Sequence, residues 1–304
     1  MPTAFSSRPS NPHLIGLIGA NVGGSLTPLL HEREAAAQGL RLAYRTLDID
    51  GLGLSPDAAG QLARDAVRLG YTGLNVTHPC KQTVMTGLDE LSEDARDLGA
   101  VNTVTVESGA PDGAGAPRLV GRNTDHSGFR AALSAGLPGA ALGTVVLVGA
   151  GGAGSAVAHA LVAAGTQHLL IADADPSRAA AVAVRLDRHT QGQRVTAIAL
   201  DEVTDALVEA DGVVNATPIG MVGHPGTPFD ASVLTPRHWV ADVVYRPLVT
   251  QLVKAALAVG CRVLDGGWLT VGQAADAFEL FTGLPADRAR MRAHFLDLVA
   301  DQTL

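Results

Sequence analysis

Cysteine is scarce in this chain, negative charge outweighs positive charge, and no apolar run is long. Cys80 and Cys261 are the only cysteines in 304 residues, too few for a disulfide framework and wrongly spaced for zinc. The formal net charge of -8 disfavours a surface for nucleic acid or for an anionic membrane. Glycine or charged residues interrupt every apolar run before it reaches membrane length. We therefore expect a cytoplasmic protein with no metal site, no nucleic-acid partner and no membrane anchor.

The residues that are abundant predict a compact globule of two domains. Hydrophobic residues make up 47% and charged residues 17%, unlike a disordered chain. The length exceeds what one ordinary hydrophobic core accommodates. Residues 1–12 lack the apolar segment of a signal peptide, and we expect them to form a flexible tail. A small anionic substrate is compatible with the overall charge, because one nearby lysine can override the average field.

A glycine-rich motif in the middle of the chain predicts a dinucleotide site. The apolar run 145–148 ends in a G-x-G-x-x-G pattern, and residues 155–161 are typical of a helix. The free amides at the helix start, with the positive end of its dipole, would hold phosphates. The pattern alone is weak in a chain with 35 glycines, and the alternative is a tight turn that binds nothing. The predicted cofactor-binding residues of this loop are Gly149, Ala150, Gly151, Gly152, Ala153 and Gly154.

A carboxylate after the next strand indicates which dinucleotide binds. Asp173 lies 19 residues beyond Gly154, where dinucleotide folds place the acid that binds the adenosine ribose diol. A carboxylate there repels a 2′-phosphate, so we predict NAD and not NADP. Arg178 is the only nearby cation, and we expect it in the following helix. Asp175 either reinforces this preference or caps that helix.

The first part of the chain alternates strands and helices, an arrangement typical of a mostly parallel sheet. Residues 108–117 are rich in glycine, alanine and proline and predict a loop. The expected strands are 14–19, 43–49, 73–77, 99–106 and 119–122, and the expected helices are 29–38 and 56–69.

Polar side chains follow the third of these strands, where ligands of open α/β sheets gather. Asn75, Thr77 and Lys81 would therefore lie at the mouth of a site. The alternative for Lys81 is a solvated lysine in the first turn of a helix, where it would oppose the helix dipole. Asp125 opens a long helix and could simply cap it or complement the charge of its start. If Lys81 and Asp125 meet, the carboxylate holds the lysine in place, and the lysine can exchange a proton with a hydroxyl.

Further polar residues precede the first helix and follow a later strand. Ser25 and Thr27 are two residues apart, and their spacing alone favours helix capping over binding of a polyol. Thr217 and Pro218 follow the strand 212–215 and would form a floor for the ribose and nicotinamide. The other strands expected in this part are 195–200, 239–245 and 261–267, and helices 268–281 and 286–299 would return to the first domain.

Several motifs in this order resemble the shikimate dehydrogenases, and more closely their NAD-linked quinate/shikimate dehydrogenase branch. The resemblance extends from about residue 14 to residue 298, and the ordered set is far more specific than any single motif. The motifs are Ser25-Leu26-Thr27-Pro28, Asn75-Val76-Thr77-His78-Pro79-Cys80-Lys81, Gly99-Ala100-Val101-Asn102-Thr103, Asn123-Thr124-Asp125, the glycine loop, Asn215-Ala216-Thr217-Pro218, and Asp265-Gly266 with Gln273.

The resemblance implies an α/β fold of two domains and a role for each motif. Residues 13–125 and 268–304 would bind a cyclohexane carboxylate, and residues 126–267 would form a Rossmann-type NAD-binding domain. Lys81 and Asp125 would be the catalytic pair. The substrate carboxylate would be held by Ser25 and Thr27, which replaces the capping interpretation, with Tyr245 nearby. The remaining implied positions are Asn75, Thr77, Asn102 and Gln273 for substrate, and Val243 and Gly266 for cofactor.

Two segments depart from the family pattern. Asp173-Ala174-Asp175 stands where the family usually has a basic Asn-Arg-Thr, which independently supports NAD. Gly267-Trp268-Leu269-Thr270 stands where the family usually places a methionine close to the nicotinamide, so we expect that wall of the site to differ.

Together the residues predict reversible NAD-dependent oxidation of a ring hydroxyl of quinate or shikimate, by a protein for which a homodimer is conceivable. Two alternatives stay open: an enzyme of the same fold acting on aminoshikimate or aminoquinate, and a non-catalytic regulator that binds dinucleotide or quinate. The presence of both Lys81 and Asp125 disfavours the regulator, because a sensor needs no proton-transfer pair.

Overall fold

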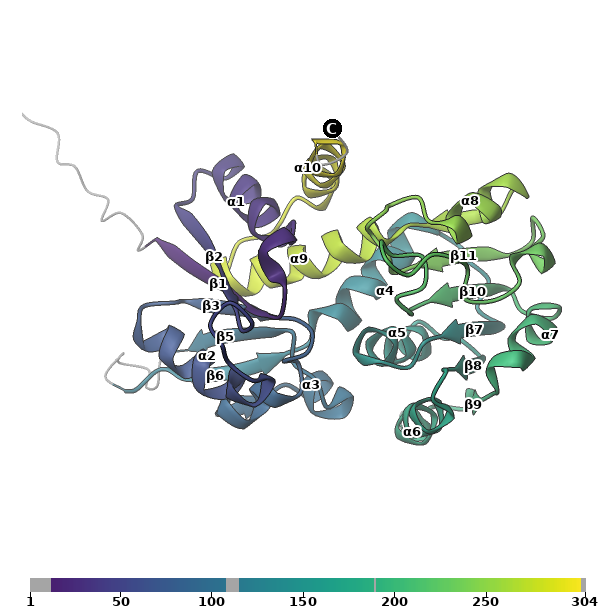
Figure 1. Cartoon of the computed structure of the whole chain (residues 1–304), viewed down its shortest axis with the longest axis horizontal. Coiled ribbons are helices and arrows are strands. Elements are labelled where there is room, and N and C mark those ends of the chain that lie inside the picture. The colour runs from purple at the N-terminus through teal and green to yellow at the C-terminus, as the bar shows by residue number, and fades with distance from the viewer. Residues whose placement is uncertain (1–11, 108–114, 189, 302–304) are drawn as a thin grey trace, which may run out of the picture.

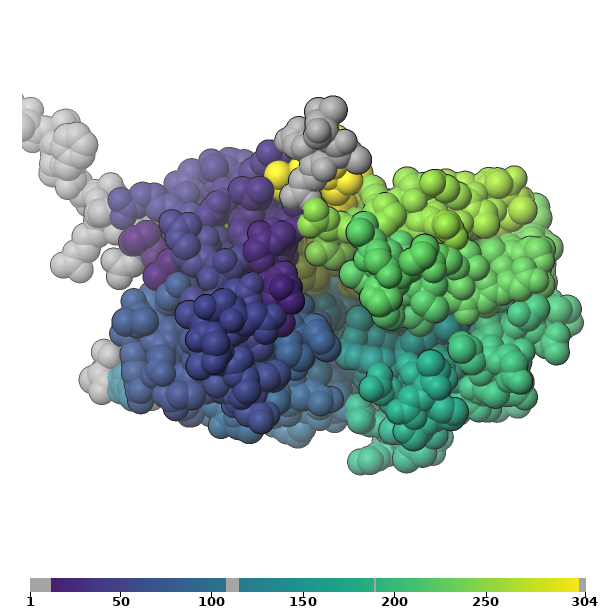
Figure 2. All heavy atoms as spheres, in the orientation of Figure 1, coloured from purple at the N-terminus to yellow at the C-terminus, as the bar shows by residue number. Residues whose placement is uncertain are grey.

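The structure, a computed structural model, describes residues 12–107, 115–188 and 190–301. In this part of the chain two six-stranded sheets stand side by side, the first purple to blue and the second teal to green (Figure 1). Their atoms face each other along a seam in the space-filling view (Figure 2). Of the predicted tail and loop, residues 1–11 and 108–114 lie outside the described residues.

The first sheet is mostly parallel, as predicted. Its strands are ordered β2-β1-β3-β5-β6-β4, and β5 alone among these six runs against the others. The strands are β1 His13–Gly19, β2 Leu42–Asp48, β3 Gly73–Val76, β4 Glu90–Leu91, β5 Thr103–Glu107 and β6 Arg118–Arg122. The associated helices are α1 Thr27–Ala37, α2 Ala59–Arg68 and α3 Glu93–Leu98, with 3-10 turns η1 Val22–Gly24, η2 Pro56–Ala58 and η3 Thr83–Gly87.

The second sheet is wholly parallel and has the strand order β12-β11-β10-β7-β8-β9. This is the Rossmann order, in which the direction of winding reverses between β7 and β10 and leaves a crevice for a dinucleotide. The strands are β7 Thr144–Val148, β8 His168–Ala172, β9 Arg194–Ala197, β10 Gly212–Asn215, β11 Trp239–Asp242 and β12 Arg262–Leu264. The accompanying helices are α5 Gly152–Ala163, α6 Pro176–Asp187, α7 Val203–Leu207 and α8 Gln251–Ala258, with 3-10 turns η4 Leu200–Glu202 and η5 Ala231–Val233.

Two long helices connect the sheets, and a third completes the return to the first one. Helix α4 (Thr124–Gly136) leads into the second sheet, and α9 (Gly266–Thr282) leads back. Helix α10 (Arg288–Asp301) then packs on α1, where Met291 and Phe295 share an apolar cluster with Leu30. The predicted return of the C-terminal helices is therefore confirmed. None of the described helices is both long and apolar enough to cross a membrane.

The connecting helices cross where each has a glycine. A Cβ atom on Gly128 of α4 would lie 2.4 Å from the backbone nitrogen of Gln273, and one on Gly272 of α9 would lie 2.5 Å from the Gly128 oxygen. Backbones can approach this closely only where no side chain intervenes. The crossing fixes α4, which carries Asp125 near its start, against the segment of α9 that carries Gln273.

Candidate active site

A cavity of about 490 Å³ is lined by residues from both halves of the chain. Each residue predicted to bind the substrate or to transfer a proton lines it. These residues come from the α1 start, the β3 end, the β5 start, the α4 start, the segment after β11, and α9: Ser25, Thr27, Asn75, Thr77, Lys81, Asn102, Asp125, Tyr245 and Gln273.

Lys81 and Asp125 form an ion pair in this cavity. The Lys81 Nζ lies 2.5 Å from the Asp125 Oδ2, and the two side chains are only 20% and 11% exposed. The capping interpretation of Asp125 is wrong, because the N-cap of α4 is Asn123, whose Oδ1 accepts from the Asp125 backbone N–H at 3.1 Å. The alternative that Lys81 is a solvated lysine in the first turn of a helix is also wrong, because Lys81 is only 20% exposed and lies in a turn before η3. The Asp125 carboxylate is thus available to orient the lysine.

Buried asparagine side chains form the floor of the cavity and have fixed orientations. The Oδ1 of Asn102 accepts from the Thr124 backbone N–H at 2.7 Å and from the Thr103 hydroxyl at 2.9 Å. In the described part of the chain its Nδ2 has no hydrogen-bond partner, so both amide hydrogens are available to an acceptor on a ligand. Asn75 is held by the Tyr44 hydroxyl, which donates to its Oδ1 at 2.7 Å. The polar groups of this floor are therefore held in place before any ligand arrives.

Hydroxyl groups gather at another part of the cavity. The Ser25 Oγ accepts from the Thr27 backbone N–H at 3.3 Å, while the N-cap position of α1 is Leu26, which cannot cap through its side chain. Ser25 therefore supports the helix start, in partial agreement with the capping expectation, and both hydroxyls also line the cavity. Burial raises the pKa of the Tyr245 phenol, so it remains a hydroxyl donor at neutral pH.

A second cavity, of about 810 Å³, runs along the glycine loop. Gly149 takes a φ of 104°, the left-handed conformation that favours glycine, and a Cβ on Gly154 would lie 1.9 Å from the Gly149 oxygen. These two glycines shape the turn without lining the cavity, and Gly266, pressed against Val244, does the same at the start of α9. The predicted cofactor residues that line the cavity are Ala150, Gly151, Gly152, Ala153, Arg178, Thr217, Pro218 and Val243.

One of the two acidic residues that follow β8 braces the glycine loop. The Asp173 Oδ2 accepts from the Ala150 backbone N–H at 2.6 Å, so the half-buried carboxylate lies against the loop, although it lines neither cavity. Asp175 is the N-cap of α6, one of the two roles that the sequence left open for this residue. Arg178 lies in α6 as predicted, and its Nε is 3.5 Å from the Asp175 carboxylate.

The two cavities meet at Lys81, one member of the predicted proton-transfer pair. Thr77, Lys81, Val243 and Tyr245 line both. A ring held between the asparagines and the hydroxyls would thus be adjacent to whatever occupies the inner end of the groove along the glycine loop. This arrangement suits direct transfer between a substrate and a dinucleotide.

Comparison with known proteins agrees with this geometry. The description "Shikimate dehydrogenase substrate binding domain" matches residues 17–104, "Shikimate / quinate 5-dehydrogenase" matches 136–220, and "Shikimate 5'-dehydrogenase C-terminal domain" matches 269–294. An NADP-named shikimate dehydrogenase of Pseudarthrobacter chlorophenolicus is 54% identical over 97% of this chain and 98% of its own length. The chain belongs to the shikimate dehydrogenase family.

Other members of this family are equally similar but differ in the cofactor that their names state. An NAD-named quinate/shikimate dehydrogenase of Corynebacterium efficiens is 51% identical over 94% of this chain and 98% of its own. The structure of a quinate dehydrogenase from Corynebacterium glutamicum in complex with NAD has a TM-score of 0.87 and 48% identity, covering 94% of this chain and 99% of that one. Identity alone therefore indicates a nicotinamide dinucleotide without deciding which.

The segment that departs from the usual shikimate dehydrogenase pattern contributes Leu269 and Thr270 to the lining of the 490 Å³ cavity, called the substrate cavity below. Trp268 turns away from both cavities, and the Arg292 guanidinium lies 5.2 Å from its ring centroid. The Thr270 hydroxyl donates to the Gly266 carbonyl at 3.0 Å. A hydroxyl and a leucine thus form the wall for which the family pattern predicted methionine.

Met221 and Arg246, absent from the sequence prediction, also line both cavities of this shikimate dehydrogenase family member. Arg246 directly follows Tyr245, and that adjacency was the one signal in the sequence that could have suggested it. Arg185 lines the 810 Å³ cavity along the glycine loop. It donates to the Leu98 carbonyl of the first half of the chain at 3.0 Å. Nothing in the local sequence indicates that contact.

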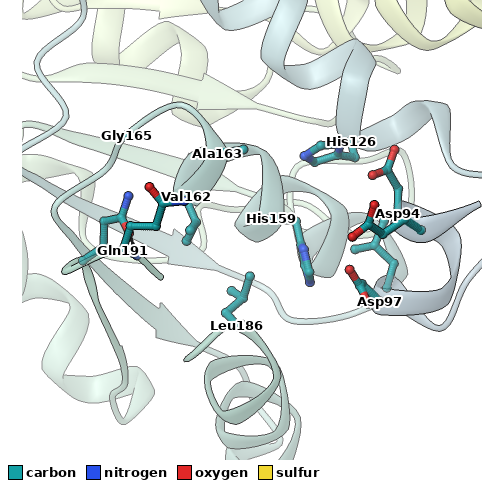
Figure 3. A pocket seen from close by; sticks show the side chains of 12 residues that line it. Asp94, Asp97, His126, His159, Val162, Ala163, Gly165, Leu186 and Gln191 are labelled. Carbon is teal, nitrogen blue, oxygen red and sulfur yellow. Dashed lines mark hydrogen bonds between the residues drawn. The ribbon is translucent and has the colours of Figure 1, made fainter. Parts of the chain in front are cut away.

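A separate cavity has none of the predicted site residues in its lining. It is lined by Asp94 and Asp97 of α3 and by His126 and His159 of the facing helices (Figure 3). The two imidazole rings meet edge to face, 6.4 Å apart. Burial lowers the pKa of His126, against the opposing effect of Asp94. No group of metal-ligating side chains suited to a metal ion occurs among residues 12–107, 115–188 and 190–301.

Proposed function

We propose that the protein catalyses the reversible NAD-dependent oxidation of one ring hydroxyl of quinate or shikimate, giving 3-dehydroquinate or 3-dehydroshikimate. The observation that carries the proposal is the position of Lys81. It is paired with Asp125 and borders both the cavity lined by the asparagines and the cavity along the glycine loop. The names of the similar dehydrogenases support the substrate class.

The side chains of this site have complementary tasks in that reaction. When bound, NAD would supply the redox chemistry by accepting a hydride from the carbinol carbon. The Lys81–Asp125 pair takes the hydroxyl proton as the carbonyl forms and returns it in the reverse direction. Asn102 donates its free amide hydrogens to a ring oxygen, and Ser25 and Thr27 hold the carboxylate. Because the asparagines are buried and already hydrogen-bonded, little ordering is required when the ring binds.

We also propose that Asp173 makes NAD the preferred cofactor. Its carboxylate follows β8 and lies against the glycine loop, where it would repel a 2′-phosphate and accept from a ribose hydroxyl. Arg178, one of the cations that line the cavity along the glycine loop, is partly offset by Asp175. The similar dehydrogenases are named for NAD in some cases and for NADP in others. Asp173 is therefore more informative about the cofactor than the overall sequence identity.

The decisive experiment measures initial rates for quinate and shikimate with NAD and with NADP. We expect reduction of NAD to dominate, and Asp173→Asn to narrow the ratio of kcat/KM for NAD over NADP by about tenfold, equivalent to ~1.4 kcal/mol for one charged contact. Asp230→Asn, at an exposed carboxylate that caps a 3-10 turn and lines neither cavity, is the matched control. Damage to the loop would lower both activities and leave the ratio intact, so an unaltered ratio would refute the role of Asp173.

The same assay tests the reaction itself. If neither quinate nor shikimate reduces NAD or NADP, the proposed oxidation is wrong. Binding of NAD and quinate without turnover would identify the protein as a non-catalytic regulator, the second alternative that the sequence left open. Turnover confined to the amino analogues would identify an aminoshikimate or aminoquinate dehydrogenase.

A further inference from the structure

Arg246 extends from the second domain across the cleft between the domains. It lies in the loop between β11 and α8, where its carbonyl oxygen accepts from the Val222 backbone N–H at 3.3 Å. Its side chain is exposed and lines both cavities. The Nη1 donates to the Gly24 carbonyl at 2.6 Å, on the first domain and 222 positions away in the sequence. The guanidinium is therefore held at the cavity rim, next to Ser25.

The charges around the substrate cavity leave Arg246 without a counter-ion. The acidic and basic side chains (Asp, Glu, Lys and Arg) among its described lining residues are those of Lys81, Asp125 and Arg246. Lys81 and Asp125, 2.5 Å apart, largely cancel each other. In the part of the chain that the structure describes, no carboxylate forms an ion pair with Arg246. The cavity thus carries a net positive charge, located on this guanidinium.

The position of this charge coincides with the hydroxyls that suit a carboxylate. Ser25 directly follows Gly24, the residue that Arg246 contacts, and Tyr245 directly precedes Arg246. Burial raises the pKa of Tyr245, and the positive charge of Arg246 opposes that rise, which places the two groups within electrostatic reach. Arg246 uses one guanidinium N–H on Gly24, so other donors of its planar fork remain for a carboxylate.

We propose that Arg246 binds the carboxylate of the ring substrate together with Ser25 and Thr27, and that its bond to Gly24 holds the guanidinium in place for this. The inference rests on the proposed oxidation of a ring hydroxyl in a substrate that carries a carboxylate. A carboxylate bound by hydroxyls alone would exchange water for neutral partners only, which is costly for an ion. Arg246 compensates that charge and attracts the anion to a protein whose net charge is negative.

The test compares Arg246→Met and Arg246→Gln with the unmodified enzyme. Glutamine can still donate to the Gly24 carbonyl but carries no charge. The matched control is Arg262→Met, an exposed arginine of the same domain whose Nη2 likewise donates to a backbone carbonyl, that of Pro138 at 2.8 Å. KM and kcat for quinate and for its methyl ester are measured at saturating NAD, and binding of quinate is measured by calorimetry.

We expect both Arg246 variants to raise the KM and the Kd for quinate about 10- to 100-fold, the range for loss of a charged hydrogen bond. The kcat and the KM for NAD should change less than about threefold, the methyl ester should be nearly unaffected, and Arg262→Met should behave like the unmodified enzyme. Increased salt should raise KM for quinate less in the variants than in the unmodified enzyme.

Three results would overturn the inference. Normal quinate binding in Arg246→Gln would mean that Arg246 acts only as a contact between the domains. An equal loss for quinate and its uncharged ester would mean the same. A rise confined to the KM for NAD would assign the guanidinium to the cofactor. Failure of the proposed function is distinguishable from all three, because the unmodified enzyme would then oxidise neither acid.

Discussion

His31 should make this protein sensitive to acid. The imidazole lies in α1, is completely buried, and is surrounded by the rings of Tyr44, Phe278 and Phe281 at centroid distances of 5.2, 6.1 and 6.0 Å. Neither ring nitrogen has a hydrogen-bond partner among the described residues. Burial lowers its pKa from 6.5 to about 3, and Glu34 only partly opposes this. The native state therefore holds a neutral imidazole.

The sign and size of the effect follow from proton linkage. Below pH 6.5 the unfolded chain binds a proton at this position and the folded chain does not, so acid favours unfolding. The stability that the neutral imidazole contributes is fully present above pH 6.5 and is lost progressively as the pH falls toward 3. At about 1.4 kcal/mol for each pH unit, the loss is about 2 kcal/mol between pH 7 and 5 and about 4 kcal/mol by pH 3.

The assay is urea unfolding at several pH values between 7.5 and 5 for the unmodified protein and for His31→Leu. Leucine fills the same apolar site and binds no proton, so the free energy of unfolding of the variant should fall about 2 kcal/mol less across this range. His224→Leu, at an exposed histidine, is the matched control and should follow the unmodified protein. Parallel curves for His31→Leu and the unmodified protein would refute the neutral buried imidazole.

Three further predictions concern the site and its supports. Lys81→Met should lower kcat about 10²- to 10⁴-fold with quinate binding by calorimetry less affected, and normal turnover would remove Lys81 from the mechanism. Gly128→Ala should lower the free energy of unfolding by about 1–3 kcal/mol in urea titrations, because its Cβ would lie 2.4 Å from the Gln273 nitrogen; Gly51→Ala, with ordinary contacts, is the control. Tyr44→Phe should cost about 1–3 kcal/mol and lower kcat/KM several-fold, because Asn75 loses a buried donor at 2.7 Å; unchanged stability and kinetics would show that the bond does not hold Asn75.

Local sequence patterns were enough to predict much of the fold. Apolar runs bounded by glycine marked most strands of both sheets, because a parallel sheet covered by helices buries both faces of its strands. The turn of the glycine loop could be predicted because the positive φ of Gly149 and the close approach of Gly154 depend on neighbouring backbone. The capping assignments were less secure: Asn123 and Asp125 are two residues apart and both suit an N-cap, and only backbone geometry selects between them.

The sequence by itself determined the strand and helix pattern, the loop suited to a dinucleotide, and the polar groups available for chemistry. The tertiary structure decided which of those groups meet. Lys81 and Asp125 are 44 positions apart. They form a pair only because the C-terminal end of β3 and the N-terminal end of α4 lie at the same cavity. The contact of Arg246 with Gly24 spans 222 positions and joins two domains. Such contacts depend on how whole sheets and helices pack, and periodicity along a single strand or helix contains no information about its distant neighbours.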